Sequence, residues 1–489
     1  MDNNKSIYLR NKNLSLNTII MCMLSILLII FAILIRHSSS NESSIFTYLT
    51  IYGVITFIWI IFSWYIKTRN IFSVYIFFML FSILFYFGQP IALLLGANAE
   101  LFKVFRVTMY SYSTLNETLL FIIISYILIH IGGLISLINI SKSEKKILIV
   151  DYSISMNIVG NILFVISLLP TLILLGNSFK AVLDYGYIGL FIASNTIAVN
   201  GGVFGVIAGF FVPSLYMLII ANSKNVVKRN VYTFILLVYI GIVFLLGRRG
   251  ENTICLVGLV LIWHSCIKPI SGKKTIKFII LGIILLFFLS IISQIRAFLN
   301  TGDISSLIVE NMNDNSIFQS IYDILAEFGT TLLVPTTLIE YVPDVIPYYK
   351  GKTIINFFMN LIPNFFWNIN PGLRDGTLES VVSPFISRQS VGGLGSSFLA
   401  EIYYNFGYWS YFIIPLYGVV IGKLSNSLRN KFTQANDKLK LYSSIYLFNI
   451  VIWYIRGEVM TSGKRIVYFV VVPVLLVRMI QKILCKNLK

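Results

Sequence analysis

Membrane-length apolar runs constrain this chain more than any other feature of its 489 residues. A helix needs about 20 mainly apolar residues to cross a bilayer, whereas the strands of a membrane barrel alternate apolar and polar residues. The runs reach such lengths without alternation, and only 12% of the residues are charged, about half the share of a soluble domain. Twelve candidate spans follow in order, at 17–35, 45–66, 71–96, 118–140, 154–176, 203–221, 230–247, 252–267, 275–298, 396–422, 441–455 and 465–484. The sequence therefore predicts an all-α, polytopic membrane helical bundle with about 12 transmembrane helices.

Basic residues gather in every second connection between these runs. Examples are 142–146, 268–277 and 423–440, whereas most of the 20 acidic residues fall in the alternate connections. Because Lys and Arg are enriched in cytoplasmic loops, this pattern predicts that both termini are cytoplasmic. Orientation then explains most of the net charge of +18, which does not indicate nucleic-acid binding here. The first run has no small-residue cleavage signal, so we expect it to remain as an anchor.

One long interruption divides the chain into three parts. The predicted parts are nine N-terminal spans in 1–298, a large extracytoplasmic loop in 299–395, and three C-terminal spans in 396–489. The loop holds nine acidic residues and six of the twelve prolines. We expect it to contain short helices and to form, with the start of the next span, a site that faces out of the cell.

Three segments of the loop have patterns of their own. Residues 305–334 are amphipathic and helix-like, and Pro335 is expected to end that helix. Residues 348–352 read as a turn. Residues 356–370 are rich in aromatic side chains and suit the membrane interface.

Glu401 is the first candidate for a catalytic group. It lies about one helical turn inside an apolar segment, and an ionisable residue there is costly and is a functional candidate by default. No histidine has a suitable place on the predicted outer face, so proton abstraction would fall to a carboxylate: Glu401, Glu327, Asp323 or Glu458. We favour Glu401 and Glu327. The alternative for Glu401 is a structural ion pair with an arginine.

A run of small residues precedes Glu401. Gly393, Gly395, Ser396 and Ser397 form a candidate backbone site, although close helix packing explains small residues equally well. No Lys-Ser or Lys-Thr follows, so the run is not a nucleotide-binding phosphate loop.

Arginines on the predicted outer side depart from the orientation rule. Each one alone is explained by contact with headgroups or by an ion pair with Glu251 or Glu458. Together they suggest a common anionic ligand, because the guanidinium fork binds phosphate in a bidentate manner. The candidates for binding a lipid diphosphate are Arg248, Arg249, Arg296, Arg388, Arg456 and Arg465.

The cysteines indicate neither a disulfide framework nor a metal site. All four lie in or beside predicted spans without metal-ligand spacing: Cys22, Cys255, Cys266 and Cys485. No metal and no cofactor is expected.

Several segments resemble one family. Residues 393–407 read Gly-Leu-Gly-Ser-Ser-Phe-Leu-Ala-Glu-Ile-Tyr-Tyr-Asn-Phe-Gly, which is similar to a signature of the Wzy-type O-antigen and capsule polymerases of bacteria. Similar elements are Tyr-Lys-Gly-Lys at 349–352 with Leu-Ile-Pro at 361–363, Gly-Arg-Arg-Gly at 247–250, and Arg456-Gly457. The resemblance covers most of the second half, whereas the first half matches only as apolar spans.

The resemblance implies a membrane glycosyltransferase of the cell envelope. It would transfer a growing glycan from undecaprenyl diphosphate to the non-reducing end of a new lipid-linked repeat unit, at the outer face of the bacterial cytoplasmic membrane. The reaction would invert the anomeric carbon, as in multi-spanning lipid-donor (GT-C-like) enzymes, and needs no nucleotide sugar. Expected partners are the undecaprenyl-diphosphate-linked oligosaccharide and membrane lipid, without nucleic acid. A chain-length-regulating co-polymerase is a further partner that the resemblance allows.

Two alternatives remain. A related O-antigen ligase would use the same lipid donor with a different acceptor. A lipid-linked oligosaccharide flippase or transporter would more often show two comparable halves, and the large loop has no counterpart in the first half.

Overall fold

The computed structural model describes residues 2–97, 107–138, 151–185, 202–246, 249–268, 270, 317–361, 377–386, 395–429 and 437–486. Throughout these residues the regular elements are helices, and no strand occurs among them. The elements of the first half are α1 (Asp2–Arg36), α2 (Glu42–Thr68), α3 (Val74–Leu94), the 3-10 turn η2 (Val107–Met109), α4 (Tyr112–Ile138), α5 (Ser153–Tyr185), α7 (Gly202–Gly209), α8 (Phe211–Ala221), α9 (Val226–Leu245), α10 (Arg249–Ile262) and the π-helical η5 (Trp263–Ile267).

The second half contains the shorter elements. They are α13 (Ile317–Phe328), η6 (Gly329–Leu332), α14 (Leu333–Tyr341), α15 (Lys352–Leu361), α17 (Leu378–Ile386), α18 (Phe398–Phe406), η8 (Gly407–Trp409), α19 (Ser410–Arg429), α20 (Lys438–Tyr454), α21 (Val459–Ile466), the π-helical η9 (Val467–Val471) and α22 (Val472–Lys486).

Polar side chains set the starts of several helices. An oxygen of each capping residue accepts a hydrogen bond from a backbone N–H of the first turn, which that turn cannot satisfy itself. The caps are Asn41 of α2, Ser73 of α3, Asn225 of α9, Ser397 of α18 and Asp437 of α20.

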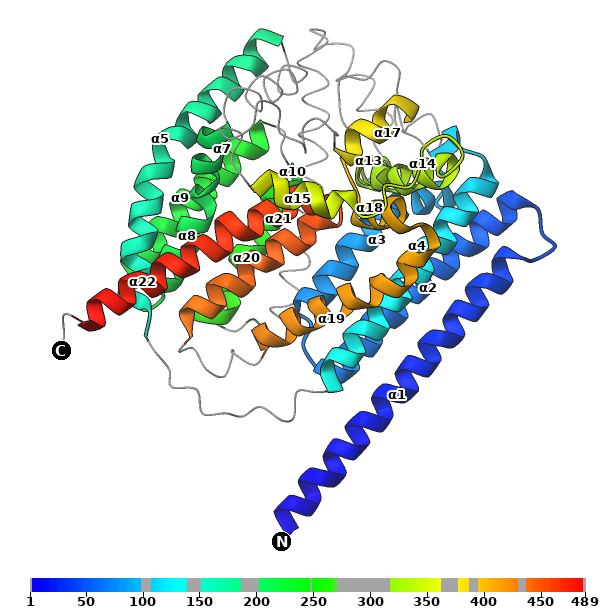
Figure 1. Ribbon diagram of the computed structural model, residues 1–489, viewed down its shortest axis with the longest axis horizontal. Helices are drawn as coiled ribbons and strands as arrows, with labels where there is room; N and C mark the ends of the chain where they lie inside the picture. The colour runs from blue at the N-terminus through cyan, green and yellow to red at the C-terminus, as the bar shows by residue number, and fades with distance from the viewer. Residues whose placement is uncertain are drawn as a thin grey trace.

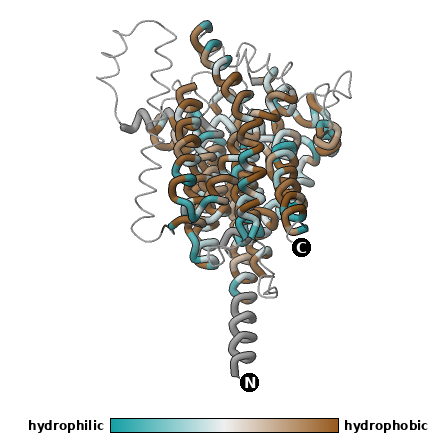
Figure 2. The backbone as a smooth tube through the Cα atoms, turned by 90° about the vertical axis from the view of Figure 1, so that its left-hand side faces the viewer, coloured by the Kyte–Doolittle hydropathy of each residue, from teal (hydrophilic) through white to brown (hydrophobic). Residues whose placement is uncertain are grey.

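Eight helices of the described chain are long and apolar enough to cross a membrane. They confirm an all-helical multi-pass membrane protein, and hydrophobic residues dominate these helices (Figure 2). The count of twelve stays a prediction, and the expected span at 275–298 lies outside the described residues.

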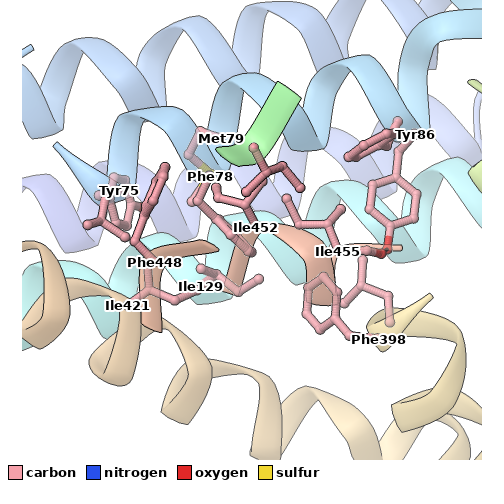
Figure 3. Close-up of a cluster of buried hydrophobic side chains, with 14 of the residues drawn as sticks. Tyr75, Phe78, Met79, Tyr86, Ile129, Phe398, Ile421, Phe448, Ile452 and Ile455 are labelled. Carbon is pink, nitrogen blue, oxygen red and sulfur yellow. Dashed lines mark hydrogen bonds between the residues drawn. The ribbon is translucent and has the colours of Figure 1, made fainter. Parts of the chain in front are cut away.

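The helices form two groups around a central pair. Figure 1 shows α1 to α4 with α19 on one side and α5, α7, α8, α9 and α22 on the other, with α10 and α20 between them. Among the described helices, the most extensive contact is between α4 and α19. Bulky side chains fill the interior. One buried cluster joins α3, α18, α20 and the C-cap of α20, and it includes Phe78, Tyr86, Phe398, Phe448 and Ile455 (Figure 3).

The short helices α13, α14, α15, α17 and α18 lie together at one end of this bundle, in the upper part of Figure 1. The opposite end holds the start of α5, the α8–α9 connection and the start of α20. There Asn222 donates a hydrogen bond to Asn157 (2.7 Å), and the Lys438 ammonium donates one to the carbonyl of Ala221 (2.8 Å). The two ends therefore differ in kind, with a helical cap at one and basic connections at the other.

Two expectations about the second half are wrong in detail. The run at 396–422 is not one span, because the chain breaks at Gly407, whose positive φ of 56° is left-handed and separates α18 from α19. Pro335 does not end a helix but lies in the first turn of α14, where its missing N–H costs no helical hydrogen bond.

Candidate functional site

The turn before α18 holds the small residues that the sequence singled out. Ser397 Oγ accepts a hydrogen bond from the Ala400 N–H (3.4 Å) and shares one with the Tyr86 hydroxyl (2.6 Å). Gly395 has a left-handed φ of 78°, and a Cβ there would come 3.2 Å from Arg456 Nε. The close approach of Arg456 and the backbone conformation both favour glycine at this position.

Glu401 lies one turn into α18 and is 3% exposed. Its Oε2 accepts hydrogen bonds from the Val459 N–H (2.8 Å) and the Tyr454 hydroxyl (3.2 Å). Its Oε1 is buried and has no hydrogen-bond partner among the described residues. Glu401 also forms no ion pair with any described arginine, so the alternative of a structural ion pair finds no support in this part of the chain.

Glu401 borders a narrow cavity between α15, α17, α18 and α21. Its volume is about 20 Å³, enough for about one water molecule. The lining residues are Tyr349, Thr353, Asn356, Thr377, Leu378, Val381, Glu401, Tyr404, Glu458 and Met460. We call this the acidic cavity, because its charged lining residues are Glu401 and Glu458.

Burial raises the pKa of the Glu401 carboxyl to about 7. The Val459 N–H acts in the opposite direction, and the negative charge of Glu458 raises the pKa further. The hydroxyls of Thr353 and Tyr454 lower it. Because α18 has nine residues and is about 14 Å long, it is too short to cross the membrane. A carboxyl with a pKa near 7 both accepts and releases a proton at neutral pH.

Glu458 is the second carboxyl of the acidic cavity. It is 7% exposed, and its Oε2 accepts a hydrogen bond from the Leu378 N–H (2.9 Å). Burial also raises the pKa of Glu458. This bond fixes the start of α17 to the α20–α21 turn.

Asn405 holds the turn at 348–352 against α18. The Gly351 N–H donates to its Oδ1 (2.8 Å), and its Nδ2 donates to the Thr353 hydroxyl (2.9 Å). The rings of Tyr349 and Tyr404 stack with centroids 5.0 Å apart and planes 9° apart. The turn and α18 thus present two aromatic rings to the acidic cavity.

Arg456 lies in the α20–α21 turn beside Gly395. Burial lowers the pKa of its guanidinium, and the negative charges of Glu327 and Glu379 raise it. The structure thus brings Glu327 near Arg456, at the exposed end of α13, but Glu327 does not line the acidic cavity.

Three buried polar atoms around this turn lack a hydrogen-bond partner within the described chain: Ser396 Oγ, Glu401 Oε1 and Ser462 Oγ. A buried unsatisfied polar atom is costly and is rare in a native structure. Three such atoms around the end of α20 indicate a place prepared for a polar ligand or for water.

The remaining candidate residues lie away from the acidic cavity or outside the residues that the structure describes. The Arg465 guanidinium lies over the Trp453 ring, 5.3 Å from its centroid, and Arg249 is the first residue of α10. The side chains of Arg249 and Asp323, and all of Arg248, Arg296, Arg388 and Gly393, lie outside the described residues.

Sequence reasoning missed three polar neighbours of Glu401. Tyr454 lies within an apolar run, where it resembles an interfacial aromatic residue. Thr353 directly follows the turn at 348–352 and Asn356 lies one helical turn further on. This proximity is the one signal that would have pointed to them.

This arrangement can accept a proton from a hydroxyl group. One carboxylate oxygen is fixed by hydrogen bonds, the other has no described partner, and stacked tyrosines suited to a sugar ring line the same cavity. The set contains the parts of a general base with a polar acceptor site.

The comparisons with known proteins fit this chemistry. The family model of the O-antigen polysaccharide polymerase Wzy matches residues 18–488, nearly the whole chain. No curated protein and no solved structure matches it. The match confirms the predicted family, and with it a membrane polymerase with glycosyltransferase-type activity on lipid-linked oligosaccharide repeat units. The chain belongs to the Wzy family of O-antigen polysaccharide polymerases.

Proposed function

We propose that this protein polymerises undecaprenyl-diphosphate-linked repeat units at the outer face of the bacterial cytoplasmic membrane, with Glu401 as general base. The observation that carries the proposal is the buried Oε1 of Glu401, which has no described hydrogen-bond partner, at the end of the bundle that holds the short helices. Both termini are then cytoplasmic, which agrees with the basic connections at the opposite end.

The proposed reaction has one displacement step. An acceptor hydroxyl at the non-reducing end of a new repeat unit gives its proton to Glu401 while its oxygen attacks the anomeric carbon of the growing glycan. The bond from that carbon to the diphosphate breaks, and undecaprenyl diphosphate leaves. Attack from the face opposite the leaving group inverts the anomeric carbon. The diphosphate is already an activated leaving group, so no nucleotide is consumed.

Cationic groups stabilise the charge of the leaving diphosphate in this proposal. Arg456 lies beside Gly395 and close in sequence to Val459, whose N–H binds Glu401. A guanidinium in a poorly hydrated site stabilises developing negative charge strongly. The other outer arginines remain candidates for binding a lipid diphosphate: Arg248, Arg249, Arg296, Arg388 and Arg465. Glu327 remains the second candidate base.

Deletion of the gene, followed by analysis of the surface glycan, tests the function. We expect loss of the polymer with retention of single repeat units on the final acceptor, and recovery of the polymer on complementation. Loss of all surface glycan would instead indicate the ligase or the flippase, and an unchanged polymer would exclude the polymerase.

A further inference from the structure

A second cavity lies on the other side of the α20–α21 turn. It has a volume of about 250 Å³ and is enclosed by α7, α8, α9, α10, α20, α21 and η9. Two neighbouring residues of α20 contact different cavities. Trp453 lines the second cavity, whereas Tyr454 donates its hydroxyl hydrogen to Glu401, which lines the acidic cavity. On α21, Met460 lines the acidic cavity and Arg465 lines the second.

The two cavities carry opposite charge. Among the described residues that line the second cavity, the charged one is Arg465, whose guanidinium lies over Trp453. The acidic cavity is lined instead by Glu401 and Glu458. An anion is therefore repelled by the first cavity and attracted by the second, and the poor hydration between helices strengthens both effects.

The start of α10 adds to the attraction. A Cβ on Gly250, the second residue of α10, would lie 3.3 Å from Trp453 Cζ3, so the first turn of this 14-residue helix borders the same tryptophan. Backbone N–H groups at a helix start are not used within the helix, and the helix dipole is positive there. Both features favour a phosphate.

A buried polar atom shows that this cavity is built for a polar occupant. Asn449 lines it and is 8% exposed, and its Oδ1 has no partner among the described residues. Its amide orientation is fixed, because Nδ2 donates to the Tyr216 hydroxyl (3.0 Å), which in turn donates to the Cys255 carbonyl (2.7 Å). Asn449 Oδ1 therefore needs a hydrogen-bond donor such as water. A water molecule bound there can donate its second hydrogen to a phosphate oxygen and so bridge Asn449 to the ligand.

We propose that the second cavity binds the diphosphate end of the polyprenyl-linked glycan, with Arg465 and the first turn of α10 at the phosphate oxygens. The inference rests on the proposed function, which supplies the lipid diphosphate. The diphosphate in this cavity is that of the acceptor, whose non-reducing-end hydroxyl lies at Glu401, one repeat unit away. The donor's diphosphate instead leaves from the anomeric carbon that this hydroxyl attacks. The assignment adds Asn449, Trp453 and the start of α10 to the binding residues.

Binding of polyprenyl diphosphate to the purified full-length protein, measured by native mass spectrometry, tests the site. We expect Arg465→Gln to weaken binding by about 10- to 100-fold, as for a lost charge-assisted hydrogen bond. Lys464→Gln is the matched control, because it removes a neighbouring cation that donates to Asn360 (2.7 Å) and does not line the cavity. Polyprenol, which lacks the diphosphate, should bind at least tenfold more weakly than polyprenyl diphosphate.

A variant that fills the second cavity tests whether the ligand binds there, independently of charge. Gly205 lines the cavity, and a Cβ there meets nothing within 4 Å, so Gly205→Leu should enter the cavity without a clash and weaken binding. Gly176→Leu is its control, since Gly176 is equally open but does not line the cavity. Competition between inorganic pyrophosphate and polyprenyl diphosphate would support the site. It would also show that the protein recognises the diphosphate group without the polyprenyl chain.

The outcomes separate this inference from the proposed function. Unchanged affinity in Arg465→Gln and Gly205→Leu, or equal affinity for polyprenol, would overturn the inference even if the deletion strain lacks polymer. Glu401→Gln should bind the lipid normally while forming no polymer. If lipid binding depends on Arg465 but the deletion strain still makes polymer, the binding site is supported and the proposed function is contradicted.

Discussion

At the scale of residues, Glu401 combines two conditions that are hard to meet together. A buried carboxylate is unfavourable, yet a base must remain accessible to its substrate. Here Oε2 is held by the Val459 N–H and the Tyr454 hydroxyl, while Oε1 borders the acidic cavity without a described partner. The fixed oxygen orients the carboxyl, and in the proposed reaction the other oxygen takes the proton of the hydroxyl. Glu458 adds negative charge that favours proton uptake by Glu401.

Replacing this carboxyl should abolish the reaction. We expect Glu401→Gln to lower the rate of polymer formation by about 10²- to 10⁴-fold, the usual contribution of a general base, with normal membrane insertion. Rates are measured with purified protein and lipid-linked repeat units. Glu340→Gln is the control, because Glu340 is exposed on α14 and does not line the cavity. Normal polymer formation by the Glu401→Gln variant would show that Glu401 is not the general base.

The pH dependence of the wild-type reaction follows from the same residue. A base must be unprotonated, and the pKa of Glu401 is about 7, so the rate should fall about tenfold per pH unit below 7 and level off above it. A stopped assay from pH 5 to pH 9 measures this profile. A rate that is flat below pH 7 would show that another group takes the proton.

At the scale of elements, the α4–α19 contact positions the site. A Cβ on Gly132 of α4 would lie 2.0 Å from the Pro415 carbonyl oxygen, and one on Gly418 of α19 would lie 2.0 Å from that of Ile129. The two backbones approach this closely because Gly418 and Gly422 form a small-residue pair at helical spacing. Since α18 leads directly into α19, this packing fixes where Glu401 lies.

A larger residue at this contact should therefore destabilise the bundle. Gly418→Leu forces the two helix backbones apart, and we expect a cost of about 3 kcal/mol or more, with a lower Tm and reduced polymer. Thermal unfolding in detergent, followed by size-exclusion chromatography, measures the effect. Gly241→Leu on α9 is the matched control, because a Cβ there meets nothing within 4 Å. An equal Tm for the two variants would contradict a close contact.

At the scale of the whole molecule, the two ends of the bundle differ in structure. The short helices, with the acidic cavity between α15, α17, α18 and α21, lie toward one end, and the basic connections lie at the other. A lipid-linked substrate is amphiphilic, and it needs a site where polar and apolar surroundings meet. The proposed orientation places that site on the outer leaflet side.

Cysteine labelling tests the orientation. In a variant without the four native cysteines, Asp344→Cys before α15 should react with a membrane-impermeant thiol reagent in intact spheroplasts. Lys224→Cys between α8 and α9 should react only after permeabilisation. Both positions are exposed, so access to the two sides of the membrane is what differs. The reverse pattern would place Glu401 in the cytoplasm and exclude the proposed reaction.

Much of the fold was predictable because a bilayer leaves few choices. Backbone groups in lipid must bond within their own segment, so long apolar runs become helices. The exceptions came from single residues: Gly407 divides the run at 396–422, and Pro335 lies within the first turn of α14. Hydropathy averaged over a span cannot detect such a local backbone effect.

For the site, the sequence by itself determined that Glu401 follows a run of small residues inside an apolar segment. It also predicted several arginines on the side where few are expected. Only the tertiary structure decided that Glu401 lines a cavity while Glu327 does not, that Tyr454 and Val459 hold one of its oxygens, and that Arg465 lies across the turn in a cavity of opposite charge. The physical reason is that solvation and pairing determine what a charged group does, and both depend on residues that are distant in sequence and meet only when the helices pack.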